Sequence, residues 1–199
     1  IALEINKNFL EVILAKGFDK ESFEILKSKK NLRMIDISNF KLKGLTSIKS
    51  FDGSFLVQSK DDIVIDKKKL KCVTKLKSSK KELAEIQFAF NVCKHVKSNA
   101  IVLCNNFSTI GIGAGQSSRL DSCKIAVQNA TQLQSSTIRN SIAASDAFFP
   151  FADGINILIK AGVKTIIQPG GSIRDQEIIN AANKAKIKMF FTGIRHFNH

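Results

Sequence analysis

A glycine-rich segment that leads into two serines and an arginine is the part of this sequence best suited to chemistry. Gly111, Gly113 and Gly115 are spaced two residues apart and are followed by Ser-Ser-Arg at 117–119. A helix that begins near Ser117 offers free backbone N–H groups and the positive end of its dipole to an anion, and the arginine adds a full charge. The spacing therefore predicts a pocket for a phosphorylated small molecule, although it matches the dinucleotide pattern G-x-G-x-x-G only loosely.

A second unusual segment places three phenylalanines around a proline, between two aspartates. The aromatic residues are Phe148, Phe149 and Phe151, and the carboxylates are Asp146 and Asp153. Such a cluster is typical either of a hydrophobic core or of a site for a planar heterocycle, where rings stack and carboxylates accept hydrogen bonds. The residues alone leave both interpretations open.

The adjacent Lys94 and His95 could form a catalytic pair in which the lysine lowers the pKa of the histidine. Both residues fall in the last turn of a predicted helix, where cations interact favourably with the negative end of the dipole. We therefore expect a structural role for this pair.

The charge balance favours acidic partners. The 199 residues carry 31 Lys and Arg against 17 Asp and Glu, a formal net charge of +14. Nucleic acids and phosphorylated or carboxylated metabolites both fit this charge. The chain has no Trp or Tyr, and its phenylalanines lie in apolar runs rather than among arginines, as a base-stacking surface requires. We expect a metabolite as the partner, and no nucleic acid.

The four cysteines, Cys72, Cys93, Cys104 and Cys123, are widely spaced and form no Cys-x-x-Cys pair. We interpret them as reduced, mostly buried residues and expect no metal site. No apolar run reaches the roughly 18 to 20 residues that a bilayer-spanning helix needs, so we expect a soluble, cytoplasmic protein without a membrane partner. The chain begins with Ile1 rather than Met, and we expect it to be a piece of a longer protein.

The hydrophobic pattern predicts an α/β fold in one compact unit, because strand-like runs alternate with helical patterns. The expected strands lie near 11–15, 32–37, 98–104, 109–113, 165–167 and 188–191, and the expected helices near 19–27, 78–96, 117–134 and 153–161, with one more that begins at Ser172 as its N-cap. Residues 41–77 alternate in short segments and are interpreted as an antiparallel excursion or flap.

Five segments together carry a resemblance to a known family. They are 96–101 (Val-Lys-Ser-Asn-Ala-Ile), 110–119 (Ile-Gly-Ile-Gly-Ala-Gly-Gln-Ser-Ser-Arg), 145–153 (Ser-Asp-Ala-Phe-Phe-Pro-Phe-Ala-Asp), 169–172 (Pro-Gly-Gly-Ser) and 195–199 (Arg-His-Phe-Asn-His). In this order they resemble the transformylase region of the bifunctional AICAR transformylase/IMP cyclohydrolase enzymes of purine biosynthesis. The segments 9–15 and 29–33 fit the same family, so the resemblance covers essentially the whole chain.

The resemblance implies transfer of a formyl group from 10-formyltetrahydrofolate to the 5-amino group of AICAR, an aminoimidazole carboxamide ribonucleotide, without a catalytic metal. It implies a cytidine-deaminase-like mixed sheet with flanking helices, and a homodimer with its active sites at the subunit interface. Residues 1–199 would form the second, C-terminal subdomain of the transformylase region. The first subdomain and the cyclohydrolase domain, which closes the product to IMP, would lie outside this chain.

The resemblance also assigns roles to individual residues. Those expected to contact AICAR are Asn99, Arg119, Phe148, Arg195 and Glu11, and those expected to contact the folate are Asp153, Ser172 and Ile173. The chemistry is reasonable, because an amide can bond a carboxamide, guanidinium groups suit phosphate, and a buried carboxylate at Asp153 can hold the amino-imine edge of a pterin.

The chain departs from the family at the catalytic centre. The family's lysine-histidine pair stands in a Lys-His-x-Asn-Pro context, whereas Lys94-His95 is followed by Val-Lys-Ser. We therefore expect no catalytic residue in this chain and no formyl transfer by the chain alone. The residues leave two other functions open: a non-catalytic module that binds a phosphorylated ligand or RNA, and a piece that serves mainly as dimer surface through the helix at 83–96.

Overall fold

The computed structural model describes residues 1–40, 46–76, 78–134, 137–196 and 198. The chain forms two compact units, residues 1–60 and residues 61–199, where the sequence analysis expected one. Within the described residues, no helix has both the length and the apolar character needed to cross a membrane.

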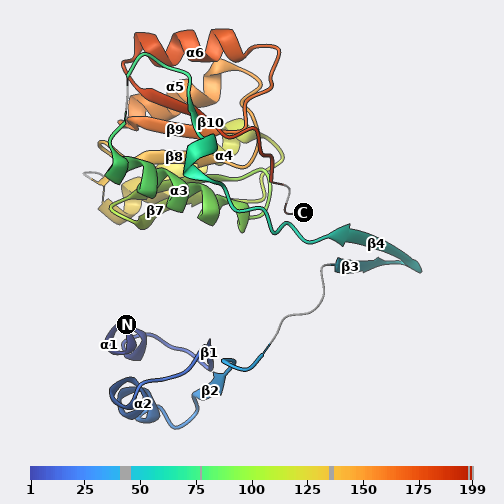
Figure 1. The fold of residues 1–199 in the computed structure, drawn as a ribbon, viewed down its shortest axis with the longest axis vertical. Helices are drawn as coiled ribbons and strands as arrows, with labels where there is room; N and C mark the ends of the chain where they lie inside the picture. The colour runs from blue at the N-terminus through green and yellow to red at the C-terminus, as the bar shows by residue number, and fades with distance from the viewer. Residues whose placement is uncertain (41–45, 77, 135–136, 197, 199) are drawn as a thin grey trace. The chain divides into compact units, whose positions relative to one another are not determined.

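The first unit is a small strand-helix-strand arrangement. Its elements are α1 (Ala2–Asn6), β1 (Val12–Ala15), α2 (Lys20–Lys27) and β2 (Arg33–Asp36), and β1 pairs with β2 in parallel (Figure 1). Asp19 begins α2 as predicted, because its carboxylate accepts a hydrogen bond from the Ser22 backbone N–H at 2.7 Å. The predicted strands and helix of this region are confirmed.

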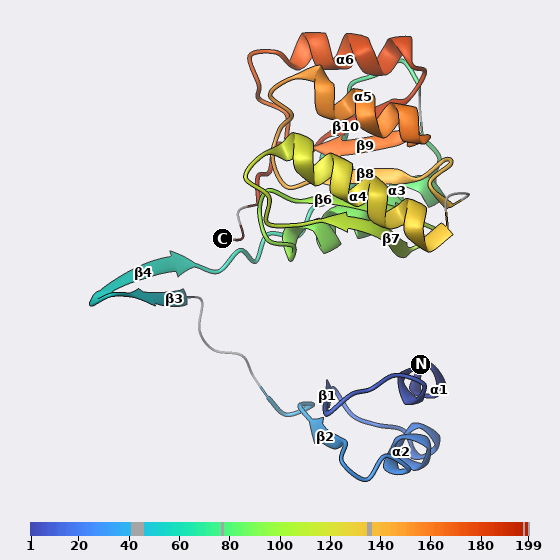
Figure 2. The ribbon, with the colours of Figure 1, turned by 180° about the vertical axis from the view of Figure 1, so that it is seen from behind.

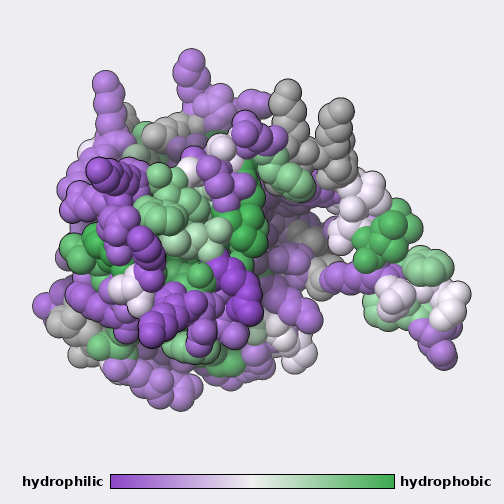
Figure 3. Space-filling view, turned by 90° about the horizontal axis from the view of Figure 1, so that it is seen from below, coloured by the Kyte–Doolittle hydropathy of each residue, from purple (hydrophilic) through white to green (hydrophobic). Residues whose placement is uncertain are grey.

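An antiparallel hairpin follows, made of β3 (Thr46–Phe51) and β4 (Ser54–Ser59). Its turn is Asp52-Gly53, a pair suited to the positive φ angles that both residues adopt. Every residue of both strands is exposed, and apolar side chains gather on the hairpin in the space-filling view (Figure 3). The hairpin confirms the antiparallel character expected within 41–77, but residues 41–45 and 77 of that segment lie outside the described residues.

The second unit is built on a mixed six-stranded sheet with the order β5-β10-β9-β8-β6-β7. The strands are β5 (Lys71–Cys72), β6 (Ile101–Asn105), β7 (Ser108–Gly113), β8 (Ile142–Ser145), β9 (Thr165–Gln168) and β10 (Lys188–Phe191). β8, β9 and β10 are mutually parallel, whereas β6 runs antiparallel to β7 and β8, and β5 runs antiparallel to β10. The predicted α/β class, with helices beside a mixed sheet, is confirmed.

Helices cover both faces of this sheet (Figures 1 and 2). On one face lies α3 (Lys80–Lys94), and on the other lie α4 (Arg119–Gln134), α5 (Ala152–Ala161) and α6 (Asp175–Lys184); the short 3-10 helix η1 (Lys67–Lys69) precedes β5. A hydrophobic core lies on each face of the sheet, because successive side chains of a strand point to opposite faces. In β6, Ile101 and Leu103 pack with α4, α5 and α6, whereas Val102 and Cys104 pack with α3.

Two of the three glycines in the glycine-rich segment have a packing role. Gly111 and Gly113 lie inside β7, and a Cβ there would stand 2.1 Å from the Ala126 carbonyl oxygen or 1.9 Å from the Ser122 carbonyl oxygen of α4. No side chain fits in that space, so the glycines allow the helix to lie directly on the strand. The expected strand at 109–113 is confirmed, and the interpretation of the three glycines as a phosphate-binding loop is wrong for these two, because they belong to the sheet.

Three further details differ from the sequence prediction. β8 was not predicted, since Ile-Ala-Ala-Ser is too short for periodicity to reveal. α4 begins at Arg119 rather than near Ser117. Ser172 is not the N-cap of α6; that position belongs to Arg174, and the Ser172 hydroxyl instead accepts a hydrogen bond from the Arg174 backbone N–H at 3.2 Å.

Candidate functional site

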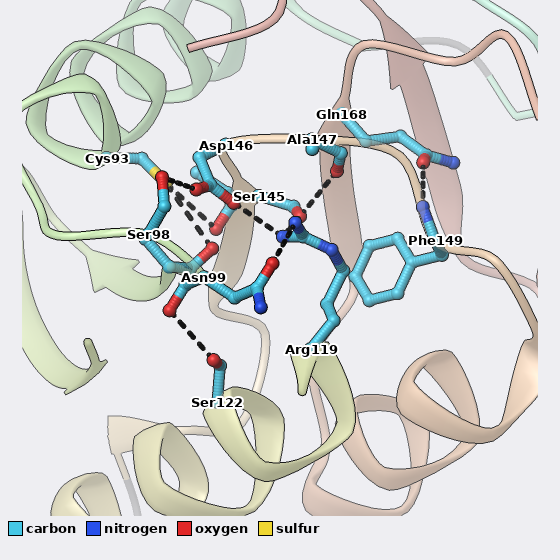
Figure 4. A network of polar contacts seen from close by, with 12 residues as sticks. Cys93, Ser98, Asn99, Arg119, Ser122, Ser145, Asp146, Ala147, Phe149 and Gln168 are labelled. Atoms are coloured by element: carbon cyan, nitrogen blue, oxygen red, sulfur yellow. Dashed lines mark hydrogen bonds and ion pairs between the residues drawn. The ribbon is translucent and has the colours of Figure 1, made fainter. Parts of the chain in front are cut away.

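The polar residues of the second unit converge where the three parallel strands end. β8, β9 and β10 finish at Ser145, Gln168 and Phe191, so their carboxyl ends share one edge of the sheet. In open α/β sheets this is the edge at which ligands bind, because loops and helix N-termini meet there. The start of α4 brings Arg119 to the same edge (Figure 4).

Arg119 is the centre of a buried hydrogen-bond network. Its Nη1 donates to Ser145 Oγ at 2.7 Å and to Asp146 Oδ1 at 2.5 Å, and its Nη2 donates to Asn99 Oδ1 at 2.9 Å. The side chains of Arg119 and Asp146 are only 8% and 2% exposed. Because the guanidinium charge is matched by a carboxylate and its direction is set by three acceptors, this arginine is rigid and already placed for a ligand.

Asp146 and Asn99 are themselves held by neighbours. Asp146 Oδ2 accepts a hydrogen bond from Ser98 Oγ at 2.6 Å, and Asn99 Nδ2 donates to the carbonyl oxygens of Gln116 at 2.9 Å and Ser117 at 3.2 Å. The loop before α4 therefore presents carbonyl oxygens to Asn99 rather than an open ring of N–H donors. The sequence analysis expected the Asn99 amide to face a carboxamide; in this structure the protein's own groups bind both of its ends.

A cavity of about 250 Å³ lies beside this network. Its lining residues come from the start of α4 and from the aromatic segment before α5: Ser118, Arg119, Leu120, Phe149, Pro150, Phe151, Asp153 and Gly154. The cavity combines apolar walls with one cation and one carboxylate, the composition typical of a small-molecule site. It joins Arg119 and Asp153, two residues that the sequence analysis assigned to different ligands.

The aromatic segment is divided between core and cavity. Phe149 is 1% exposed, and its backbone N–H donates to Gln168 Oε1 at 2.9 Å. Phe151 is 48% exposed, and the Arg174 guanidinium lies 4.7 Å from the centre of its ring. Phe148 is half-buried and does not line the cavity. The segment therefore contributes Phe149 to the hydrophobic core and Phe151 to the exposed lining of the cavity.

Asp153 differs from its prediction. The sequence analysis expected a buried carboxylate, but Asp153 is exposed, and its Oδ1 accepts a hydrogen bond from the backbone N–H of Gly154 at 2.7 Å. It stands in the first turn of α5, where the helix dipole favours a negative charge. The carboxylate therefore lines the cavity at a point that solvent reaches.

None of the remaining predicted residues is among those that line the cavity. Glu11 is exposed and belongs to the first unit, just before β1. Ser172 is half-buried and Ile173 fully exposed in the turn before α6, which approaches the cavity through the contact of Arg174 with Phe151. Arg195 is exposed on the segment after β10.

The sequence analysis missed two of the three acceptors of Arg119, Ser145 and Asp146, and the serine that donates to Asp146. Asp146 was noted only as a neighbour of the phenylalanines, and Ser98 and Ser145 only as parts of motifs. Their place in the sequence could have identified Ser145 and Asp146. Both directly follow a short apolar run, and polar residues are expected where a strand ends at a ligand site. The unpredicted β8 concealed this signal.

The thiols near the site are buried rather than reactive. Burial raises the pKa of Cys123 to about 12, and burial together with the charge of Asp146 raises the pKa of Cys93 well above its ordinary value. Cys93 donates to the carbonyl oxygens of Ala100 and Ala144. The prediction of reduced, mostly buried cysteines is confirmed, with Cys72 half-buried.

Lys94 and His95 occupy the end of a helix, as the sequence analysis expected. Lys94 is the last residue of α3 and the exposed His95 is its C-cap, as the dipole argument predicted. In the part of the chain that the structure describes, no group of three His, Cys, Asp or Glu residues is placed to hold a metal ion.

Comparison with known proteins gives consistent similarities. Residues 1–129 match the family described as AICARFT/IMPCHase bienzyme. The chain is 50% identical over 207 residues to the bifunctional purine biosynthesis protein PurH of Bartonella bacilliformis, 47% over 207 residues to that of Rhodospirillum rubrum, and 46% over 198 residues to that of a Thermoanaerobacter species. Each alignment covers the whole of this chain, which spans about 38% of the length of these relatives.

Proposed function

The chain belongs to the AICARFT/IMPCHase bienzyme family, with a role in purine biosynthesis, and on this premise we propose that it is part of a folate-dependent formyltransferase. The reaction is transfer of the formyl group of 10-formyltetrahydrofolate to the 5-amino group of AICAR. The remainder of the longer protein supplies the catalytic lysine-histidine pair and the cyclohydrolase that closes the formylated product to IMP.

One observation carries this proposal: the buried network around Arg119 opens onto the cavity that Asp153 also lines. A nucleotide and a folate must lie next to each other for the formyl group to pass between them, because direct transfer requires reacting atoms about 3 to 3.5 Å apart. A fixed guanidinium and a solvated carboxylate that line the same cavity support the proposal that the two ligands meet there.

The roles of the side chains follow from their chemistry. Asn99 and Arg119 bind the polar part of AICAR, Phe148 supplies apolar contact from the adjoining segment, and Arg195 offers a second guanidinium for phosphate or carboxylate. Asp153 accepts hydrogen bonds from the pterin, and the Ser172-Ile173 turn meets the folate from the side of Phe151. Glu11, in the first unit, is assigned to AICAR by the family resemblance.

The chemistry of formyl transfer sets what the rest of the enzyme must add. The aromatic amine of AICAR is a poor nucleophile, so a base must remove its proton while donors stabilise the tetrahedral oxyanion. We assign the base to the part of the protein outside this chain and expect no formyl transfer by the chain alone. We further propose that the protein works without a metal, in the cytoplasm, as a homodimer with its sites at the subunit interface.

The experiment that tests this function uses the full-length bifunctional protein and measures both activities. Replacement of the arginine, Arg119→Ala, should lower kcat/KM for formyl transfer by about 100-fold, since it removes several charged hydrogen bonds. IMP cyclisation should stay within about 2-fold of the unmodified protein, because that chemistry takes place elsewhere.

Two further variants make the result decisive. Arg119→Lys keeps a positive charge beside Asp146 but loses the planar fork, so it should fold normally and still lose most of the formyl transfer. Arg139→Ala, at an exposed arginine away from the cavity, should leave both activities unchanged. Equal loss of both activities in Arg119→Lys would contradict the proposed function. Unimpaired formyl transfer in both Arg119→Ala and Arg119→Lys would contradict it as well.

A further inference from the structure

A buried histidine lies outside the network described above. His196 is 2% exposed, and its Nδ1 lies 2.5 Å from Asp61 Oδ2. Its ring packs against Phe90 of α3, with 4.8 Å between the ring centres. A buried imidazole that makes both a short polar contact and a ring contact has a defined orientation, which a histidine in a mobile tail would lack.

Asp61 is held in place on its other side. Its Oδ1 accepts a hydrogen bond from the Ile63 backbone N–H at 3.2 Å and lies 3.7 Å from Lys94 Nζ, which in turn donates to the Ile63 carbonyl oxygen at 2.9 Å. Burial acts to raise the pKa of Asp61, but the hydrogen bond and charge of His196 and the charge of Lys94 outweigh it, and the pKa is lowered. The carboxylate is therefore ionised at neutral pH, and Nδ1 of His196 is the donor.

The segment that carries His196 crosses the edge of the sheet where the site lies. Three backbone hydrogen bonds fix it there: Thr192 N–H to the Gln168 carbonyl at 3.0 Å, His196 N–H to the Asp146 carbonyl at 3.0 Å, and Ser98 N–H to the Asn198 carbonyl at 2.8 Å. Two of these bonds reach Asp146, which holds Arg119 in place, and Ser98, which donates to Asp146. The imidazole lies directed inward at this point, whereas its neighbour Arg195 is exposed.

We propose that His196 is a positioning residue: its contacts with Asp61 and Phe90 pin residues 192–196 so that Arg195 is held ready for AICAR. The inference deepens the proposed function and rests on it. A long arginine side chain on a loose segment must lose backbone and rotamer freedom when it binds, and a segment that is already ordered avoids that cost. Asp61, which follows the β3–β4 hairpin in sequence, thereby ties the beginning of the second unit to its end.

The test uses steady-state formyl transfer by the full-length protein, with KM for AICAR and kcat measured separately. His196→Phe keeps a ring against Phe90 but removes the Nδ1 donor, and should raise KM for AICAR about 10-fold while kcat changes by less than about 3-fold. His196→Asn places an amide N–H near the position of Nδ1, and should restore KM to within about 3-fold of the unmodified protein.

Two combinations of variants separate positioning from a general loss of structure. If the histidine acts through its neighbour, His196→Phe should raise KM no further in a protein that already carries Arg195→Ala. In the same way, Asp61→Asn combined with His196→Phe should be no worse than the more severe of the two single variants.

The outcomes distinguish this inference from the proposed function. Absence of formyl transfer in the unmodified full-length protein would overturn the function, and the inference with it. Normal activity with an unchanged KM in His196→Phe, or an undiminished effect of that variant in the Arg195→Ala protein, would overturn the positioning role alone and leave the function standing.

Discussion

Two ion pairs at opposite edges of the six-stranded sheet have the same length but different surroundings. At the carboxyl edge, Arg119 and Asp146 are 2.5 Å apart and 8% and 2% exposed. At the amino edge, Lys188 Nζ lies 2.5 Å from Glu82 Oε2, with the side chains 25% and 20% exposed. Glu82 also accepts a hydrogen bond from Thr165 at 2.8 Å, and so ties α3 to the first residues of β9 and β10.

The difference in burial indicates different purposes. Two charges removed from water lose solvation energy that their attraction only partly returns, so a fully buried pair is poor evidence for stability and better evidence for a required geometry. The pair at the amino edge keeps part of its hydration and connects three elements, as a structural support does. The comparison therefore agrees with the proposal of a ligand site at the carboxyl edge.

The largest effect on stability is expected where the buried pair is broken. Asp146→Asn leaves the Arg119 guanidinium buried without a counter-charge and should lower the free energy of unfolding by about 3 kcal/mol. The measurement is urea unfolding of the protein at pH 7, followed by far-UV circular dichroism. The matched variant at the other edge is Glu82→Gln, and a loss in Asp146→Asn no larger than that in Glu82→Gln would remove the distinction between the two pairs.

Replacement of both partners of the buried ion pair tests whether the unpaired charge causes this loss of stability. Arg119→Met combined with Asp146→Leu replaces both partners by apolar groups and should recover most of the stability lost in Asp146→Asn, because no charge is then buried alone. Formyl transfer should be lowered about as far as in Arg119→Ala, because both proteins lack the guanidinium group. Recovery of stability together with activity would show that the network is not needed for the reaction.

A smaller loss is expected at the glycine that lets α4 lie on β7. In Gly113→Ala the new Cβ would overlap the Ser122 carbonyl oxygen, so helix and strand must separate, at a cost of about 2 kcal/mol in the free energy of unfolding. Gly171→Ala is the control, since nothing lies within 4 Å of its Cβ position and only the positive φ is strained. The same unfolding measurement compares them, and equal losses would argue against close packing at Gly113.

The parts of the fold that could be predicted are those with a local cause. The helix at Lys20–Lys27 follows from its Asp19 cap, and the helix at Lys80–Lys94 follows from its apolar stripe and the Ser79 cap, whose hydroxyl accepts from the Glu82 backbone N–H at 3.3 Å. The division into two units was not predicted, because no local pattern marks a boundary near residue 60.

The site was predictable in its members but not in their arrangement. Asn99 and Arg119 were identified from the family motif, but the hydrogen bond between them was not predicted. The arrangement also depends on β8, a strand of four residues that is too short to show a periodic hydrophobic pattern. Ser172 looked like a helix cap by residue type, but α6 begins three residues later because residues 172–175 first form a turn, in which the Asp175 N–H donates to the Ser172 carbonyl oxygen at 3.0 Å. Tertiary contacts decided these points.

The smallest effect is expected at the amino edge, and it disappears in acid. Burial acts to raise the pKa of Glu82, but the hydrogen bonds from Lys188 and Thr165, together with the charge of Lys188, outweigh it and lower that pKa. A carboxyl with a lowered pKa in the folded state contributes stability above its ordinary pKa of about 4.3, and this contribution disappears as the pH falls through the lower value. At pH 7 we expect Glu82→Gln to cost about 0.5 kcal/mol, since solvent screens the pair.

The pH dependence of stability tests the role of the Glu82 charge more strictly than the stability of this variant at one pH. Below about pH 4 the unmodified protein should approach Glu82→Gln in stability, because protonation removes the same charge that the substitution removes. The measurement is the urea midpoint from pH 7 to pH 3 for both proteins. If the difference in urea midpoint between the two proteins stayed constant over this range, Glu82 would stabilise the amino edge by its shape and hydrogen bonds rather than by its charge. The two edges would then differ in the burial of their side chains, and a comparison of two ion pairs would no longer describe them.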